Sequence, residues 1–279
     1  MHMQEASLRA FRNAQPPVPA TLMHASPIEP GERTRRFYVE ALTVLDEAGL
    51  DYVVGGGYAM AFYTGIRRNT KDLDIFVRPE DHRRILQELE RAGYRGEYFY
   101  PFWIAKAVQG EDFIDILYNS GNGQCRVDDD WITNAREVEI LGYRTRLVPP
   151  EEQLWSKSFV MDRDRYDGAD VLHLIMSCGE GLDWARLLRR FAGHERVLLS
   201  HLVLFDYAFP SERAKIPHDV MDHLLSVAAD RRPGERVCYG PNVSQQSFLP
   251  DVHERGLADG RLQPVGPLTE ADLSQLPAH

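Results

Sequence analysis

The sequence has few cysteines and no long apolar run. Its 279 residues include three cysteines, Cys125, Cys178 and Cys238, whose spacing fits neither a zinc site nor a disulfide framework. No apolar stretch approaches the ~20 residues of a membrane span, and the N-terminal segment lacks the apolar core of a secretory signal. We therefore expect a protein in a reduced, cytoplasmic setting, with no membrane partner.

The sequence also lacks an excess of positive charge. Its formal net charge is −10. Proteins that bind long nucleic acids normally present a basic field, so we expect no long nucleic acid as a partner. Arginines and a lysine do cluster between residues 67 and 84, and most of these are expected to lie on solvated surfaces.

The most informative stretch runs from residue 52 to residue 77, YVVGGGYAMAFYTGIRRNTKDLDIFV. A short apolar strand stops at three glycines, residues 55–57. A helix is expected to follow and to end at Gly65, which suits a left-handed cap. Glycines at a strand-to-helix junction let backbone N–H groups approach a ligand closely, and the helix N-terminus adds unpaired donors and a positive dipole end. This stretch therefore predicts a phosphate-binding turn.

Two carboxylates follow the basic turn that ends at Lys71. In the predicted strand Leu73–Val77, side chains alternate between the faces, so Asp72 and Asp74 share one face. Like charges this close repel each other, and oxygen ligands suit Mg²⁺ or Mn²⁺. A glycine turn or an Asp-x-Asp pair alone is usually structural. Their combination with the helix and the basic turn favours a functional site.

This stretch resembles the signature of the polymerase-β-type nucleotidyltransferase superfamily, in which a Gly-Gly or Gly-Ser turn and a helix precede Asp-x-Asp/Glu in a strand. The segment RNTKDLD is similar to small bacterial members, namely antibiotic nucleotidyltransferases and abortive-infection-type toxins. The fourteen residues between Gly57 and Asp72 lie at the long end of the family spacing, which suggests an enlarged turn. The resemblance implies metal-dependent transfer of a nucleoside monophosphate from an NTP.

A third carboxylate is expected on a neighbouring strand. Asp115 stands inside the apolar run DFIDILYN, where a carboxylate is costly unless it is paired, hydrogen-bonded or bound to a metal. The superfamily usually places its third acid on such a strand, so Asp115 is our candidate. Asp112, at a predicted turn, is the alternative and is expected to be solvated. Asp128 to Asp130 are interpreted as a surface loop rather than as a metal site.

The resemblance also implies residues outside the sheet. Small members of the superfamily often carry a lysine on the first helix after the catalytic domain, followed by a charged segment; Lys157 matches the lysine, and Arg165, Asp167 and Asp170 match the segment. Lys157 could neutralise triphosphate charge, since lysine is a compact phosphate-binding cation. The alternative is a solvent-facing helix lysine.

These inferences assign roles to ten residues. Asp72, Asp74 and Asp115 are expected to hold the metal and, with Lys157, to be catalytic. The residues expected at the nucleotide are Gly56, Gly57, Arg68, Thr70, Lys71 and Asp170. The acceptor stays open between a small molecule such as an antibiotic, a protein side chain and a tRNA end. Alternatives are a toxin-type enzyme acting on tRNA, a nucleotide-binding regulatory module without turnover, and a structural partner protein.

The expected fold class is α+β. Residues 33–148 are predicted to form a catalytic domain with a small mixed sheet and flanking helices, including a hairpin over 138–148 that turns at Gly142. A helical domain is expected over 149–230, with further helix over 182–209 in which His194 and His201 are ordinary helix residues. An N-terminal arm, 1–32, and a loop-rich tail, 231–279, flank the two domains.

Overall fold

The structure is a computed structural model that describes residues 30–232, except positions 69, 71, 101–102, 122 and 162–164 and the side chains of 99–100. The predicted N-terminal arm and C-terminal tail therefore lie almost wholly outside the described residues, as does Cys238. The other two cysteines are free thiols. In the part of the chain that the structure describes, no helix combines the length and the apolar character needed to cross a membrane.

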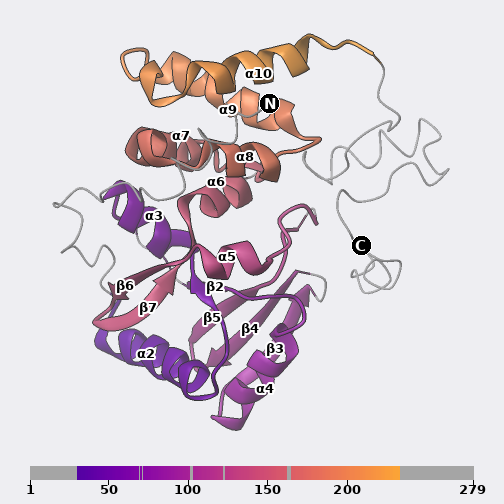
Figure 1. The fold of residues 1–279 in the computed structure, drawn as a ribbon. Helices are drawn as coiled ribbons and strands as arrows, with labels where there is room; N and C mark the ends of the chain where they lie inside the picture. The colour runs from indigo at the N-terminus through magenta and orange to yellow at the C-terminus, as the bar shows by residue number, and fades with distance from the viewer. Residues whose placement is uncertain are drawn as a thin grey trace.

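The described strands form one seven-stranded mixed sheet in the order β3-β4-β5-β2-β1-β7-β6 (Figure 1). The strands are β1 (Val53–Val54), β2 (Leu73–Phe76), β3 (Arg95–Tyr100), β4 (Ile104–Gln109), β5 (Asp112–Leu117), β6 (Arg136–Ile140) and β7 (Tyr143–Leu147). Strand β2 is parallel to β5, and β1 is parallel to β7, whereas the remaining neighbours are antiparallel. This mixed sheet confirms the α+β fold class. The β6–β7 hairpin, turning at Gly142, is also confirmed.

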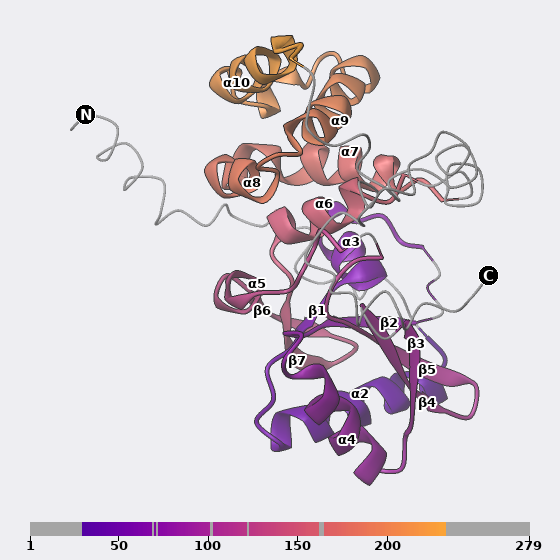
Figure 2. The ribbon, with the colours of Figure 1, turned by 90° about the vertical axis from the view of Figure 1, so that its right-hand side faces the viewer.

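Helices α2 (Glu32–Glu47) and α4 (His82–Arg91) lie together against one face of the sheet (Figures 1 and 2). Asp112, the first residue of β5, accepts a hydrogen bond from Thr34 on α2 at 2.7 Å and pairs with Arg33. Its side chain is only 11% exposed, so the expectation of a solvated turn residue was wrong. Because side chains alternate along β5, Asp115 points to the opposite face, away from α2.

The short helix α5 (Asp129–Thr133) precedes β6. After β7 the chain is mainly helical. The helices there are α6 (Pro150–Ser158), α7 (Gly168–Cys178), α8 (Trp184–Arg190), α9 (Glu195–Ala208) and α10 (His218–Ala229), with 3₁₀ turns at Gly179–Gly181 and Arg213–Lys215. Figure 1 shows the last five helices stacked on the side of the sheet away from α2 and α4. The region 182–209, predicted as helix, contains two helices, α8 and α9, because the chain turns between them at Gly193, where φ is +81°.

Helix α3 (Gly56–Thr64) joins the two parts. It packs on β2 and also contacts α6 and α7. It ends at Gly65, which has the predicted left-handed conformation (φ +70°) and donates its N–H to the carbonyl of Ala61. Buried apolar side chains form one continuous cluster from Phe37 to Leu224. The helical part is therefore packed directly onto the sheet part.

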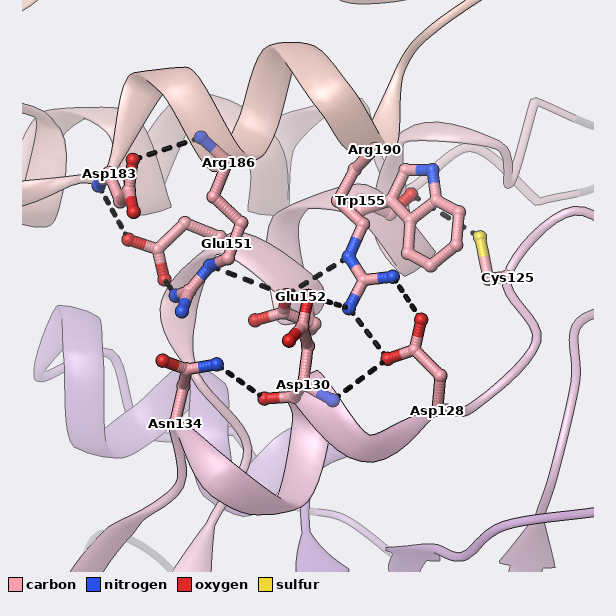
Figure 3. Close-up of polar contacts among 10 residues, drawn as sticks. All are labelled: Cys125, Asp128, Asp130, Asn134, Glu151, Glu152, Trp155, Asp183, Arg186 and Arg190. Carbon is pink, nitrogen blue, oxygen red and sulfur yellow. Dashed lines mark hydrogen bonds and ion pairs between the residues drawn. The ribbon is translucent and has the colours of Figure 1, made fainter. Parts of the chain in front are cut away.

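Ion pairs also join α5, α6 and α8 (Figure 3). Arg190 of α8 donates to Asp128 at 2.8 Å and to Glu152 of α6 at 3.1 Å, and Arg186 pairs with Glu151. Asp128 was predicted to lie in a surface loop; it is exposed, as predicted, but it caps the N-terminus of α5 by accepting from the N–H of Asp130. The acidic run therefore begins a helix and contacts arginine rather than forming an isolated loop.

Candidate active site

Three carboxylates meet on the face of the sheet opposite α2. Asp74 of β2 lies directly beside Asp115 of the parallel strand β5, and Asp72 immediately precedes β2. Each of the three offers an oxygen, and these oxygens all lie within 4.8 Å of one another. The alternation inferred from the sequence is present, because Leu73 and Ile75, which alternate with the two acids along the chain, are fully buried. The structure thus brings together all three predicted metal-ligating residues, hereafter the carboxylate triad.

The triad brings three acidic groups together, and the pairing of Lys106 with Asp115 offsets only part of their negative charge. The pKa of Asp74 is raised to about 7, mainly by burial and also by the neighbouring charges of Asp72 and Asp115, while Lys157 and Arg165 oppose the rise. Burial also raises the pKa of Asp115, against the hydrogen bond and positive charge of Lys106. A divalent cation would remove the repulsion among the three groups. An all-oxygen donor set of this kind fits Mg²⁺ or Mn²⁺.

The glycine turn lies directly against Asp74. The N–H of Gly55 donates to the backbone carbonyl of Asp74 at 2.9 Å. Gly56 has φ +55°, and a Cβ on it would come within 1.6 Å of Asp74 Oδ2. A Cβ on Gly57 would lie 3.2 Å from the Cβ of Thr70. Glycine is therefore required at position 56 by both backbone conformation and space, and the N-terminus of α3 reaches the triad.

The basic turn contributes a further set of contacts. The hydroxyl of Thr70 donates to Asp72 Oδ1 at 2.6 Å, which fixes the orientation of that carboxylate. Arg68 is 57% exposed and pairs with Asp170 Oδ1 at the start of α7. Lys71 lies outside the described residues.

Lys157 of α6 is held by two acids. Its Nζ lies 2.6 Å from Asp167 and 3.1 Å from Asp170 Oδ2, and its side chain is only 15% exposed. The alternative of a solvent-facing helix lysine therefore does not describe this residue. Burial acts against ionisation of Asp167, but Arg165 and Lys157 hold its pKa below the usual value. Because Lys157 and Arg165 also lower the pKa of Asp74, this charged cluster lies within electrostatic reach of the triad.

Sequence reasoning missed two residues beside the site. Lys106 of β4 lies opposite Asp115 and pairs with it. The tight turn at Gly110–Glu111 fixes this register, so the turn was a usable signal for the pairing. Gln153 of α6 is 1% exposed, and its Nε2 donates to the carbonyl of Gly56 at 3.4 Å. No local signal in the sequence indicates that α6 packs on the glycine turn.

A model of a family described as an uncharacterised nucleotidyltransferase matches residues 30–205 of the chain. Comparison with curated proteins gave no match.

Several solved structures are similar to the chain at low identity. The antibiotic-resistance factor ANT(2'')-Ia in solution is 17% identical, with 61% of this chain and 96% of that chain covered and a TM-score of 0.41. An antigenic nucleotidyltransferase-like protein from Paracoccidioides brasiliensis is 18% identical, with 69% and 98% covered and a TM-score of 0.44. A lincomycin-bound lincosamide antibiotic adenylyltransferase is 20% identical, with 51% and 95% covered and a TM-score of 0.37. At these values the likenesses carry no argument about substrate.

Proposed function

From the premise that this chain belongs to the nucleotidyltransferase family whose model spans residues 30–205, we propose that it transfers a nucleoside monophosphate from an NTP to an acceptor hydroxyl or phosphate and releases pyrophosphate. The observation that carries this proposal is the convergence of three acidic side chains, Asp72, Asp74 and Asp115, beside a glycine turn at a helix N-terminus. Such a transfer needs little covalent chemistry from the protein, which has to position the reactants and neutralise charge.

In this proposal the triad binds Mg²⁺ or Mn²⁺. When held there, a divalent cation would supply charge stabilisation for the triphosphate and the leaving pyrophosphate, and activation of the acceptor oxygen. Thr70 holds the carboxylate of Asp72 in a fixed orientation through its hydrogen bond. Gly56 leaves the carboxylate of Asp74 the space that a side chain at position 56 would fill.

The backbone N–H groups of Gly56 and Gly57 donate hydrogen bonds to phosphate oxygens, because the N-terminus of α3 favours negative charge. Arg68 and Lys157 supply positive charge on the side of the helical part. Lys71 is assigned to the nucleotide from its position in the sequence alone. Asp170 orients two of these cations, because Oδ1 pairs with Arg68 and Oδ2 with Lys157. Its contribution to nucleotide binding is therefore indirect.

The experiment that tests this function does not require the acceptor to be known. Wild type and Asp74→Asn are incubated with each α-labelled NTP, Mg²⁺ and a cell extract, and both the labelled product and the released pyrophosphate are measured. We expect metal-dependent labelling with wild type only. Protease, RNase or filtration then assigns the labelled acceptor to protein, tRNA or small molecules.

Binding measurements separate the alternatives. Calorimetry of the purified protein with a non-hydrolysable NTP and Mg²⁺ detects binding without turnover. Nucleotide binding without labelling or pyrophosphate release in any extract would favour a regulatory module. Absence of metal-dependent NTP binding in the folded protein would contradict the proposal.

A further inference from the structure

Four charged side chains, three acidic and one basic, cross the sheet in one row. Strand register places Asp74 of β2 beside Asp115 of β5, Asp115 beside Lys106 of β4, and Lys106 beside Glu97 of β3. Directly paired residues on neighbouring strands project from the same face of a sheet, so all four belong to the face that carries the triad. Lys106 is thus the positive member of a row that begins at the proposed metal site.

The position of Lys106 is fixed by two contacts with β5. Its Nζ lies 2.6 Å from Asp115 Oδ1 and 4.2 Å from the centroid of the Phe113 ring. Phe113 and Asp115 are on the same face of β5, so the ammonium group lies over that strand beside the triad. The side chain of Lys106 is 20% exposed and that of Asp115 is 10% exposed, which limits screening of the pair by solvent.

We propose that Lys106 is a positioning residue that serves as the built-in counter-ion of the triad, fixing the carboxylate of Asp115 and opposing the binding of a divalent cation. This inference rests on the proposed metal-dependent function. The lysine reduces the charge of the ionised site from three negative charges to two, which keeps the three acids together without metal but weakens their attraction for one. Divalent cation then binds most favourably together with the phosphates of the nucleotide.

The test measures binding of Mn²⁺ alone by calorimetry at about pH 8, above the Asp74 pKa of about 7. Lys106→Met is compared with wild type, and Lys106→Gln removes the charge but keeps a hydrogen-bond donor. Lys106→Arg keeps the charge. The matched control is Lys215→Met, because Lys215 is 19% exposed and pairs with Glu180 and Glu212 in the helical part.

Removing the charge should tighten Mn²⁺ binding about tenfold, a typical coupling between two interacting sites. Lys106→Met and Lys106→Gln should both show this gain, whereas Lys106→Arg and Lys215→Met should resemble wild type. The melting temperature of Lys106→Met should fall in EDTA, and saturating Mn²⁺ should raise it by more than in wild type. A lysine that only supports packing would change the melting temperature equally with and without metal.

A double-variant experiment identifies the partner. In an Asp115→Asn background, Lys106→Met should give much less gain in Mn²⁺ affinity, because the pair is already broken. Unchanged or weaker Mn²⁺ binding by both neutral variants would overturn the inference while leaving the proposed function intact. If neither wild type nor any Lys106 variant binds Mn²⁺, either alone or with a non-hydrolysable NTP, the metal-dependent function fails along with the inference.

Discussion

Asp74 and Gly56 lie so close together that a side chain at position 56 would displace the Asp74 carboxylate. The Asp74 carboxylate fills the volume where a Cβ at position 56 would stand, and the positive φ of Gly56 disfavours any other residue. At the scale of single residues, the glycine turn is therefore a condition for the geometry of the triad. Its role in phosphate binding is an additional proposal.

Gly56→Ala tests this role, with Gly49→Ala as a matched control. Gly49 also has a positive φ, +63°, but a Cβ there would meet nothing within 4 Å. Both variants should lose about 1 kcal/mol of stability through backbone strain. Only Gly56→Ala should also lose most of its Mn²⁺ affinity, measured by calorimetry. Equal metal affinity in the two variants would show that Asp74 tolerates displacement.

Asp74→Asn should abolish Mg²⁺-dependent transfer without unfolding the protein. A carboxyl group whose pKa is raised to about 7 stabilises the fold below its unfolded-state pKa, and this contribution is lost as the pH rises towards 7. Asparagine does not titrate, so the variant has no such pH-dependent loss of stability, and the repulsion of residue 74 by Asp72 and Asp115 is removed as well. The melting temperature of the metal-free variant, relative to wild type, should therefore increase between about pH 4 and pH 8. An active Asp74→Asn enzyme would contradict the proposed mechanism.

At the scale of elements, α6 and α8 are joined by charges that are largely removed from water, and Arg190 extends this contact to the more exposed Asp128 before α5. Glu152 of α6 is fully buried and accepts from Arg190 at 3.1 Å, while its second oxygen has no hydrogen-bond partner (Figure 3). Burial raises the pKa of Glu152 to about 7, although Arg186 and Arg190 oppose the rise. This junction should therefore respond to pH between the ordinary glutamate value and 7.

Glu152→Gln should remove this pH response. Because the folded-state pKa is raised, the wild-type carboxyl stabilises the fold at low pH and loses that contribution as the pH rises towards 7. The stability of the variant relative to wild type should thus rise by ~2 kcal/mol between about pH 4 and pH 8, measured by urea unfolding. Glu180→Gln is the control, because Glu180 is 79% exposed. A pH-independent difference for Glu152→Gln would show that this carboxyl does not titrate in the range.

At the scale of the whole molecule, the helical part places positive charge beside the triad. Lys157 is on α6, whereas Asp72 and Asp74 are on or next to β2, and packing of α3 against β2, α6 and α7 holds these parts together. The acids Asp167 and Asp170 hold Lys157 in place. Nucleotide would therefore be bound jointly by the sheet part and the helical part.

Lys157→Ala should weaken NTP use, measured as kcat/KM, by roughly one to three orders of magnitude, because a charge-assisted phosphate contact is lost. Lys157→Arg should recover only part of the activity, since the planar guanidinium does not replace a compact ammonium. Lys215→Ala, which changes a similarly buried lysine far from the triad in sequence, should retain wild-type kinetics. Wild-type kinetics in Lys157→Ala would restrict Lys157 to a structural role.

Local patterns in the sequence determined much of the fold and part of the site. Alternation along a strand is a property of the chain itself, so Asp72 and Asp74 could be placed on one face without knowing their neighbours. The glycine turn, the cap at Gly65 and the hairpin over 138–148 likewise follow from backbone preferences of a few adjacent residues.

Tertiary structure alone decided how distant segments meet. The pairing of Asp74 with Asp115 depends on the parallel register of β2 and β5. These strands are neighbours in the sheet, but α4, β3 and β4 lie between them in the sequence. The approach of Gln153 to the glycine turn and of Lys157 to Asp170 depends on how the helices pack. Periodicity indicates which face of an element is apolar, but the contact partner is selected by packing of the complete core.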